Sequence, residues 1–304
     1  MRSWPEWGQP VASVIVIRLD AATVLLQWAV GGMLFCWFTT RRREVGVGYG
    51  WLLRATYLGL VIAGLLAAWR SGWSAGRDVA AGFTALSIAV ALVVSVARRA
   101  AGVSGQQVEH DRRTERVAAM TGIERSGLAG APETSSRDDP EFPPLLDLIP
   151  AGIGLIGVVA AGLDAGGNAG LAVARTVIGA VFLGSVTDAM LLGHWYLVQP
   201  GLPRRLLNEL VASLGWIWPA EVAVMLIPTG MVTVLNGGID DGWGGILGWF
   251  WVACAITTIA LVFVTRAALK ERAYSAVMAA TGLLYLAILT AFGTDLVARA
   301  VLAG

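Results

Sequence analysis

Three charged side chains, Arg54, Asp188 and Glu221, interrupt apolar stretches of the sequence. Each of these stretches is about long enough to cross a lipid bilayer as a helix. A charged group in hydrocarbon costs at least about 2.5 kcal/mol, so such residues face protein, water or an opposite charge. We expect the three side chains to line one intramembrane polar pocket, with both acids facing the seam between successive helices. Their negative charges would repel, so one acid is protonated, or Arg54 or an imported cation lies between them.

Glu221 stands between Pro219 and Pro228, and this predicts a break in its helix. Proline has no N–H group to bond the carbonyl four residues earlier, so Gly215 and Val224 lose their helical partners. In a membrane these oxygens need another donor, such as water, a side chain or a bound ion. Transporters build midplane sites from broken helices of this kind. The alternative is a kinked helix with a protonated or hydrogen-bonded Glu221.

Small residues precede Asp188 on its helix face. Ala180, Gly184 and Asp188 are spaced four apart, so they share one face. Small residues let helices approach closely, and Asp188 is therefore expected to face protein. Arg54 lies at a depth similar to that of Asp147, which permits an ion pair, although Arg54 is equally able to reach toward Asp188.

Two further charged residues of the apolar segments, Arg175 and Asp295, lie nearer the outer face, where snorkelling to the interface suffices for them.

His194, Trp195 and Tyr196 form the densest group of chemically able side chains. They suit a proton relay or the edge of a quinone site, or else an aromatic belt at the membrane interface. A haem with two histidine ligands needs a second intramembrane histidine, and the other one, His110, lies in a charged loop. The chain alone is therefore not expected to hold a haem b with two histidine ligands.

No cofactor or metal is predicted from sequence motifs. Cys36 and Cys254 lie at different depths without CxxC spacing and are typical of buried apolar residues. The sequence has no Walker loop, dinucleotide fingerprint, GxSxG or HExxH motif. The net charge of +1 gives no case for nucleic-acid binding.

The elements that must position these residues are helices that cross a bilayer. Hydrophobic residues make up 56% of the 304 residues and charged residues only 14%, where soluble domains have about 25% charged residues. A bilayer core needs about 20 helical residues. Eight apolar segments meet that length: 21–40, 48–69, 79–97, 145–163, 172–198, 207–235, 244–265 and 274–301. We predict an all-α polytopic membrane protein that is embedded in a lipid bilayer, of the bacterial cytoplasmic type.

The arginines of the loops predict the orientation of the helices. Cytoplasmic loops retain Lys and Arg, and the expected cytoplasmic markers are Arg41, Arg98, Arg204 and Lys270, with Asp240 outside. Both termini then lie outside. The chain divides into helices 1–3 (1–97), one longer charged cytoplasmic loop (98–144) and helices 4–8 (145–304). A loop of this size is too small to fold alone as a catalytic domain.

Three functions remain open from the sequence. The first is a small-solute or proton-coupled transporter, and a weak likeness between the segments around Met33 and Met190 suggests a repeat of four plus four helices. The second is a non-enzymatic subunit of a respiratory complex with partner membrane subunits, in which His194, Trp195 and Tyr196 lie beside a quinone. The third is an intramembrane enzyme that acts on a lipid, with His194 and a carboxylate as acid and base. An enzyme is the less favoured class.

Overall fold

The computed structural model of the protein describes residues 20–104, 141–199, 201–226, 230–271 and 273–303. Within these ranges the chain is helical and contains no strand. Eight helical segments of the described residues are long and apolar enough to cross a membrane. The predicted fold class is confirmed: this is an all-α polytopic membrane protein. The predicted charged loop lies outside the described residues over 105–140.

The first four spans belong to the N-terminal half of the chain. They are α1 (Ala21–Thr40), α2 (Val47–Ser71), α3 (Ala75–Ala97) and α5 (Leu148–Asp164), with a short 3-10 turn, η2 (Pro144–Asp147), directly before α5. A second 3-10 turn, η1 (Arg99–Ala101), follows α3.

The other four spans are α6 (Ala169–Val198), α7 (Arg205–Leu226), α9 (Ile246–Lys270) and α10 (Tyr274–Leu302). A short helix, α8 (Met231–Leu235), lies between α7 and α9. The predicted segment 207–235 is therefore two helices and not one. The described part of α7 ends at Leu226, and Pro228 lies outside the described residues.

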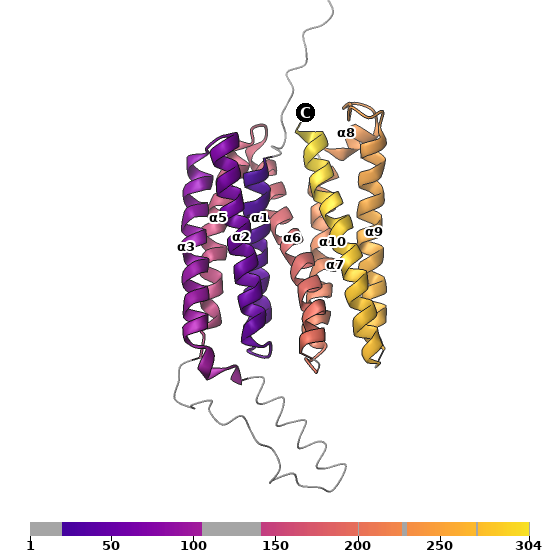
Figure 1. The fold of residues 1–304 in the computed structure, drawn as a ribbon. Coiled ribbons are helices and arrows are strands. Elements are labelled where there is room, and N and C mark those ends of the chain that lie inside the picture. Colours follow the sequence, from indigo (N-terminus) through magenta and orange to yellow (C-terminus); the bar gives the residue numbers. More distant parts are fainter. Residues whose placement is uncertain (1–19, 105–140, 200, 227–229, 272, 304) are drawn as a thin grey trace, which may run out of the picture.

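The eight spans form two groups of four (Figure 1). In the N-terminal bundle, α1 and α3 each pack against both α2 and α5. In the C-terminal bundle, α6 and α9 each pack against both α7 and α10. The order of neighbours is thus the same in both bundles.

The two bundles meet mainly where α1 packs against α6. A Cβ atom on Gly31 would overlap the backbone of Ala180, and one on Gly184 would overlap the backbone of Gly31. Trp28 Nε1 donates to Thr187 Oγ1 across the same contact, at 2.9 Å. The predicted small-residue face of α6 is confirmed, since only glycine lets the two backbones come this close.

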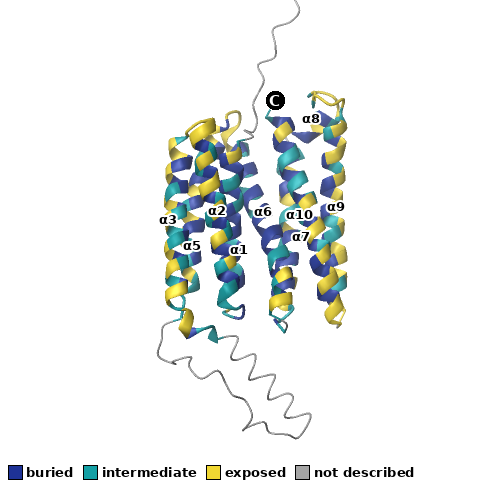
Figure 2. Ribbon diagram, viewed as in Figure 1, coloured by how far each residue is buried: buried dark blue, intermediate teal, exposed yellow. Residues whose placement is uncertain are grey.

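The surfaces of both bundles that point away from the other helices are apolar. Figure 2 shows the buried residues gathered between the helices and exposed residues on the outside. The exposed ones include large apolar side chains such as Leu66, Phe83, Ile256 and Leu289, at 57, 58, 60 and 70% exposure. Exposed apolar surface of this extent suits contact with lipid tails and not with water.

The two ends of the helix assembly differ in charge. One end, here named the basic end, carries Arg41 and Arg42 in the loop after α1, Arg204 in the loop after α6, and Arg205 at the start of α7. At the opposite end, named the terminal end, α1 begins and α10 ends (Figure 1). Three ion pairs between described residues join the bundles at the basic end. Arg42 Nη1 lies 2.6 Å from Glu209 Oε1, Arg41 Nη2 lies 3.7 Å from Glu209 Oε2, and Arg205 pairs with Glu44.

Candidate functional site

The densest group of buried charges lies toward the terminal end of the C-terminal bundle. It contains Arg175 of α6, Glu221 of α7, and Asp295 and Arg299 of α10, and none of them is more than 1% exposed. Arg299 Nε lies 2.9 and 2.8 Å from the two carboxylate oxygens of Asp295. Arg299 Nη2 also donates to the backbone carbonyl of Arg175, at 3.0 Å. The four side chains, named here the outer cluster, tie α6 and α10 together around Glu221.

Gln27 of α1 extends the outer cluster toward the N-terminal bundle. With its amide oriented to satisfy both donors, Gln27 accepts from Arg299 Nη2 at 2.9 Å and from the backbone N–H of Ala180 at 3.2 Å. A Cβ atom on Gly179 would lie 2.7 Å from both Arg299 Nη2 and Asp295 Oδ1. Glycine at this position leaves the space that the polar side chains occupy.

Arg175 satisfies one of the backbone oxygens that the prolines deprive of a partner. Its Nε donates to the carbonyl of Val224, at 2.7 Å. This is the oxygen that was expected to need a new donor because Pro228 has no N–H. The donor is a side chain of the neighbouring helix, and it brings a positive charge close to Glu221.

The predicted helix break at Pro219 is wrong. The helix α7 continues through Pro219 as far as Leu226. A proline removes one backbone bond and crowds the preceding turn, and the remaining bonds of a helix can hold it together. A kink at Pro219 stays a prediction.

Glu221 is the acid of the outer cluster whose carboxyl group makes no hydrogen bond to a described residue. It is fully buried, and neither carboxyl oxygen has a hydrogen-bond partner among the described residues. The charged side chains around it are Asp295, Arg299 and Arg175. Arg299 is engaged with Asp295, and two neighbouring carboxyl groups do not both ionise in a dry environment. Glu221 is therefore the group of the cluster that is best placed to carry a proton.

Arg54 belongs to a second cluster, toward the basic end of the N-terminal bundle. Its Nε and Nη2 each lie 2.7 Å from an oxygen of Asp147, and its Nη1 lies 3.1 Å from Ser95 Oγ. The ring of Phe142 covers the guanidinium at 4.1 Å. Of the two partners that the sequence allowed for Arg54, the structure selects Asp147, and the pair is fully buried.

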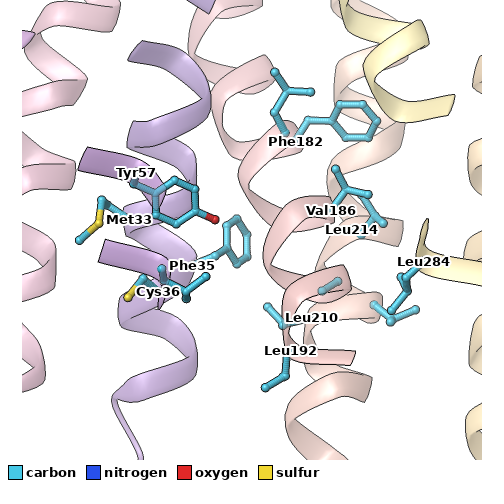
Figure 3. Close-up of a cluster of buried hydrophobic side chains, with 14 of the residues drawn as sticks. Met33, Phe35, Cys36, Tyr57, Phe182, Val186, Leu192, Leu210, Leu214 and Leu284 are labelled. Carbon is cyan, nitrogen blue, oxygen red and sulfur yellow. The ribbon is translucent and has the colours of Figure 1, made fainter. Parts of the chain in front are cut away.

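Asp188 has a third environment, where α6 meets the N-terminal bundle. Its carboxyl group is fully buried and accepts a hydrogen bond from the hydroxyl group of Tyr57 on α2. Figure 3 shows Tyr57 among the apolar side chains of the core, with its hydroxyl group directed toward the C-terminal bundle. As predicted, Asp188 faces protein.

The three residues expected to share one pocket thus have three different sets of partners. Arg175, which neighbours Glu221, and Asp188 are thirteen residues apart on α6, or about 20 Å along the axis. Arg54 and Asp188 do not contact each other. Cys36 lies between them, close enough to interact electrostatically with both. The structure does not bring Asp188, Glu221 and Arg54 together.

His194, Trp195 and Tyr196 point into three different surroundings. His194 is exposed, and its Nδ1 lies 3.3 Å from the hydroxyl group of Tyr285. Trp195 donates to Gln199 at 3.0 Å. Tyr196 is buried and donates to the carbonyl of Pro203 at 2.7 Å. Consecutive residues of a helix are about 100° apart, so they do not form one site by themselves.

The outer cluster was not predicted from the sequence. Arg175 and Asp295 were assigned to snorkelling at the outer face, and both are fully buried. The spacing of Asp295 and Arg299, four residues apart on one helix, is a signal that would have predicted their ion pair. No sequence signal pairs this helix with Gln27 and Arg175, which come from distant segments.

In comparisons with protein-family models, with curated proteins and with solved structures, nothing matched this chain.

Proposed function

We propose that this protein is a proton-coupled transporter of a small solute, in which Glu221 takes up and releases the coupling proton. The observation that carries the proposal is the state of Glu221: fully buried, without a hydrogen-bond partner among the described residues, and surrounded by two arginines and a second acid. Ionisable groups held in this way inside a membrane commonly belong to ion or proton pathways.

The surroundings of Glu221 suit both of its protonation states. A neutral Glu221 avoids repulsion from Asp295 and leaves Arg299 paired with that residue. A charged Glu221 has Arg175 and Arg299 as nearby cations, so the group of four residues is formally neutral. A carboxyl group whose surroundings stabilise both the neutral and the charged form can take up and release a proton during a transport cycle.

The two bundles supply the kind of architecture that transport needs. They have the same order of neighbours and touch at the glycine contact of α1 and α6. Alternating access is often a rocking of one bundle against another around a fixed site. Between α1 and α10, an apolar groove of about 570 Å³ separates the bundles on one side.

Proteoliposomes offer a direct test. Solutes from a panel of amino acids, amines, carboxylates and sugars are added under an inward proton gradient, and internal pH is followed with a trapped dye. We expect at least one solute to change proton flux through the wild-type protein. In Glu221→Gln the response falls at least about tenfold, the rate equivalent of about 1.4 kcal/mol.

The matched control is Glu209→Gln, the same change on the same helix. Glu209 is partly exposed at the basic end, where it pairs with Arg41 and Arg42. This variant should retain the response. A wild-type protein that behaves like empty liposomes with every solute, or a Glu221→Gln variant as active as the wild type, contradicts the proposal.

The redox-subunit alternative has less support from the geometry. Tyr196 is committed to a backbone carbonyl, and His194 and Trp195 have separate partners. A quinone head-group is held by polar groups that converge on it.

A further inference from the structure

We propose that Asp188 is a second proton-binding site, built between the two bundles and occupied by a proton when they are in contact. The proposal stands on the surroundings of Asp188 alone and does not depend on Glu221 or on transport.

Asp188 makes few hydrogen bonds for a buried acid. One carboxyl oxygen, Oδ1, accepts from the hydroxyl group of Tyr57. The other oxygen, Oδ2, is buried and has no partner among the described residues. The hydroxyl group of Tyr49, on the same face of α2 two turns earlier, is likewise buried without a described partner. A charged carboxylate normally accepts several hydrogen bonds, and here a single one is present.

Asp188 has no counter-ion among its described neighbours. The titratable side chains around Asp188 are Tyr57 and Tyr49 of α2 and Cys36 of α1. No charged side chain of α7, α9 or α10 in the described ranges acts on Asp188. Arg54, which lies beyond Cys36, makes two hydrogen bonds to Asp147 and one to Ser95.

An isolated carboxylate that is removed from water costs several kcal/mol, and such groups take up a proton instead. The neutral acid is therefore the form that fits this site, with its proton on Oδ2. Because Oδ1 is held by Tyr57, the position of the proton is specified by the structure.

Asp188 lies in the contact between the two bundles. It lies one helical turn along α6 from Gly184, whose missing side chain lets α6 reach the backbone of Gly31. The ring of Tyr57 packs where a Cβ atom of Gly32 would lie. The bond from Tyr57 to Asp188 thus joins the N-terminal bundle to the C-terminal bundle. Asp188 is fully buried in this arrangement, so we expect its proton to be retained while the two bundles are in contact.

Infrared spectroscopy of the purified protein tests the inference, because a protonated carboxyl group has a C=O stretching band that a carboxylate lacks. We expect Asp188→Asn to remove one such band at neutral pH. Glu209→Gln, a change at the partly exposed acid, should leave that band in place. A spectrum of Asp188→Asn with the same protonated-carboxyl bands as the wild type overturns the proposal.

A second variant keeps the test decisive if Asp188→Asn does not fold. Tyr57→Phe removes the hydroxyl donor and keeps the ring that packs against Gly32. The band of Asp188 should remain and move to higher frequency, because its carboxyl group loses a hydrogen bond. An unmoved band means that the protonated group is another acid, such as Glu221, and also overturns the proposal.

Discussion

The two bundles differ in how completely their buried charged side chains are hydrogen-bonded. In the N-terminal bundle, Arg54 and Asp147 make two hydrogen bonds of 2.7 Å, and Ser95 and Phe142 complete the surroundings of the guanidinium. In the C-terminal bundle, Arg299 is engaged with Asp295, and the second acid, Glu221, is left without a hydrogen bond among the described residues.

Some buried charges therefore hold the fold together, and others are available for chemistry. A buried ion pair with complete hydrogen bonding resists a change of protonation state. If one partner became neutral, the other would be a buried charge without a counter-ion. An acid that is buried but uncommitted can gain or lose a proton with less rearrangement. The paired arrangement suits a structural role, and the unpaired acid suits a site that binds and releases a proton.

The largest expected effect comes from breaking the complete pair. In Arg54→Met, the carboxyl group of Asp147 stays buried without its cation, which should lower the free energy of unfolding by about 3–5 kcal/mol. Thermal unfolding in detergent measures the change. The double variant Arg54→Met with Asp147→Leu should recover most of the loss, since an apolar pair carries no unpaired charge. If the single variant is as stable as the wild type, the pair has no structural role.

A smaller effect is expected in the C-terminal bundle. Glu221→Gln should change the free energy of unfolding by less than about 1 kcal/mol, because one uncommitted polar group replaces another of the same shape. Asp295→Asn should cost more, since it takes the charge partner from Arg299. The same unfolding assay compares the two. A loss in Glu221→Gln as large as that in Arg54→Met would show that Glu221 is paired, and the contrast between the bundles would disappear.

The smallest effect concerns Asp241, an acid of the C-terminal half outside the membrane spans. Backbone N–H groups of Gly245, Trp243, Gly248 and Leu247 donate to its carboxylate. These bonds, led by that from Gly245, hold the pKa of Asp241 below its usual value of 3.8. A lowered pKa stabilises the loop above that value, and the contribution is lost as pH falls through the lowered pKa.

Amide hydrogen exchange at Trp243, relative to its intrinsic rate, measures this loss. Protection should decrease in acid in the wild type, and in Asp241→Asn it should be low throughout. Equal protection in both proteins at neutral pH would show that the carboxylate does not order the loop. Asp241 thus differs from Glu221, because this acid outside the membrane spans has several hydrogen-bond donors.

Part of the fold followed directly from the sequence. Bilayer-length apolar segments must satisfy every backbone polar group internally, and a helix does this within one segment. The number of spans and most of their ends were therefore predictable, as was the close approach at Gly184. The seventh span extends to Lys270, beyond the predicted end at 265, because a helix continues past its apolar part.

The partners of the buried charges were not predictable in the same way. The sequence placed Arg54 at a depth where both Asp147 and Asp188 were possible partners, and only the packing of α2 beside α3 and η2 decided between them. Glu221 was expected beside Asp188 because α6 and α7 are neighbours. Those two helices do pack together, but Glu221 lies near Arg175 and the charged pair of α10, and Arg175 is about 20 Å along α6 from Asp188.

Hydropathy, which is a local property, thus determined that the chain is a membrane protein, with eight spans in its described part and with acids and arginines buried among them. Which acid is paired, which is held by a tyrosine and which is left uncommitted was decided by tertiary structure alone. The physical reason is that a partner depends on the rotation of each helix about its axis, at about 100° per residue, and on which distant helix lies opposite. Gln27, Arg175 and Arg299 converge from three helices that are far apart in the chain, and no local pattern encodes that convergence.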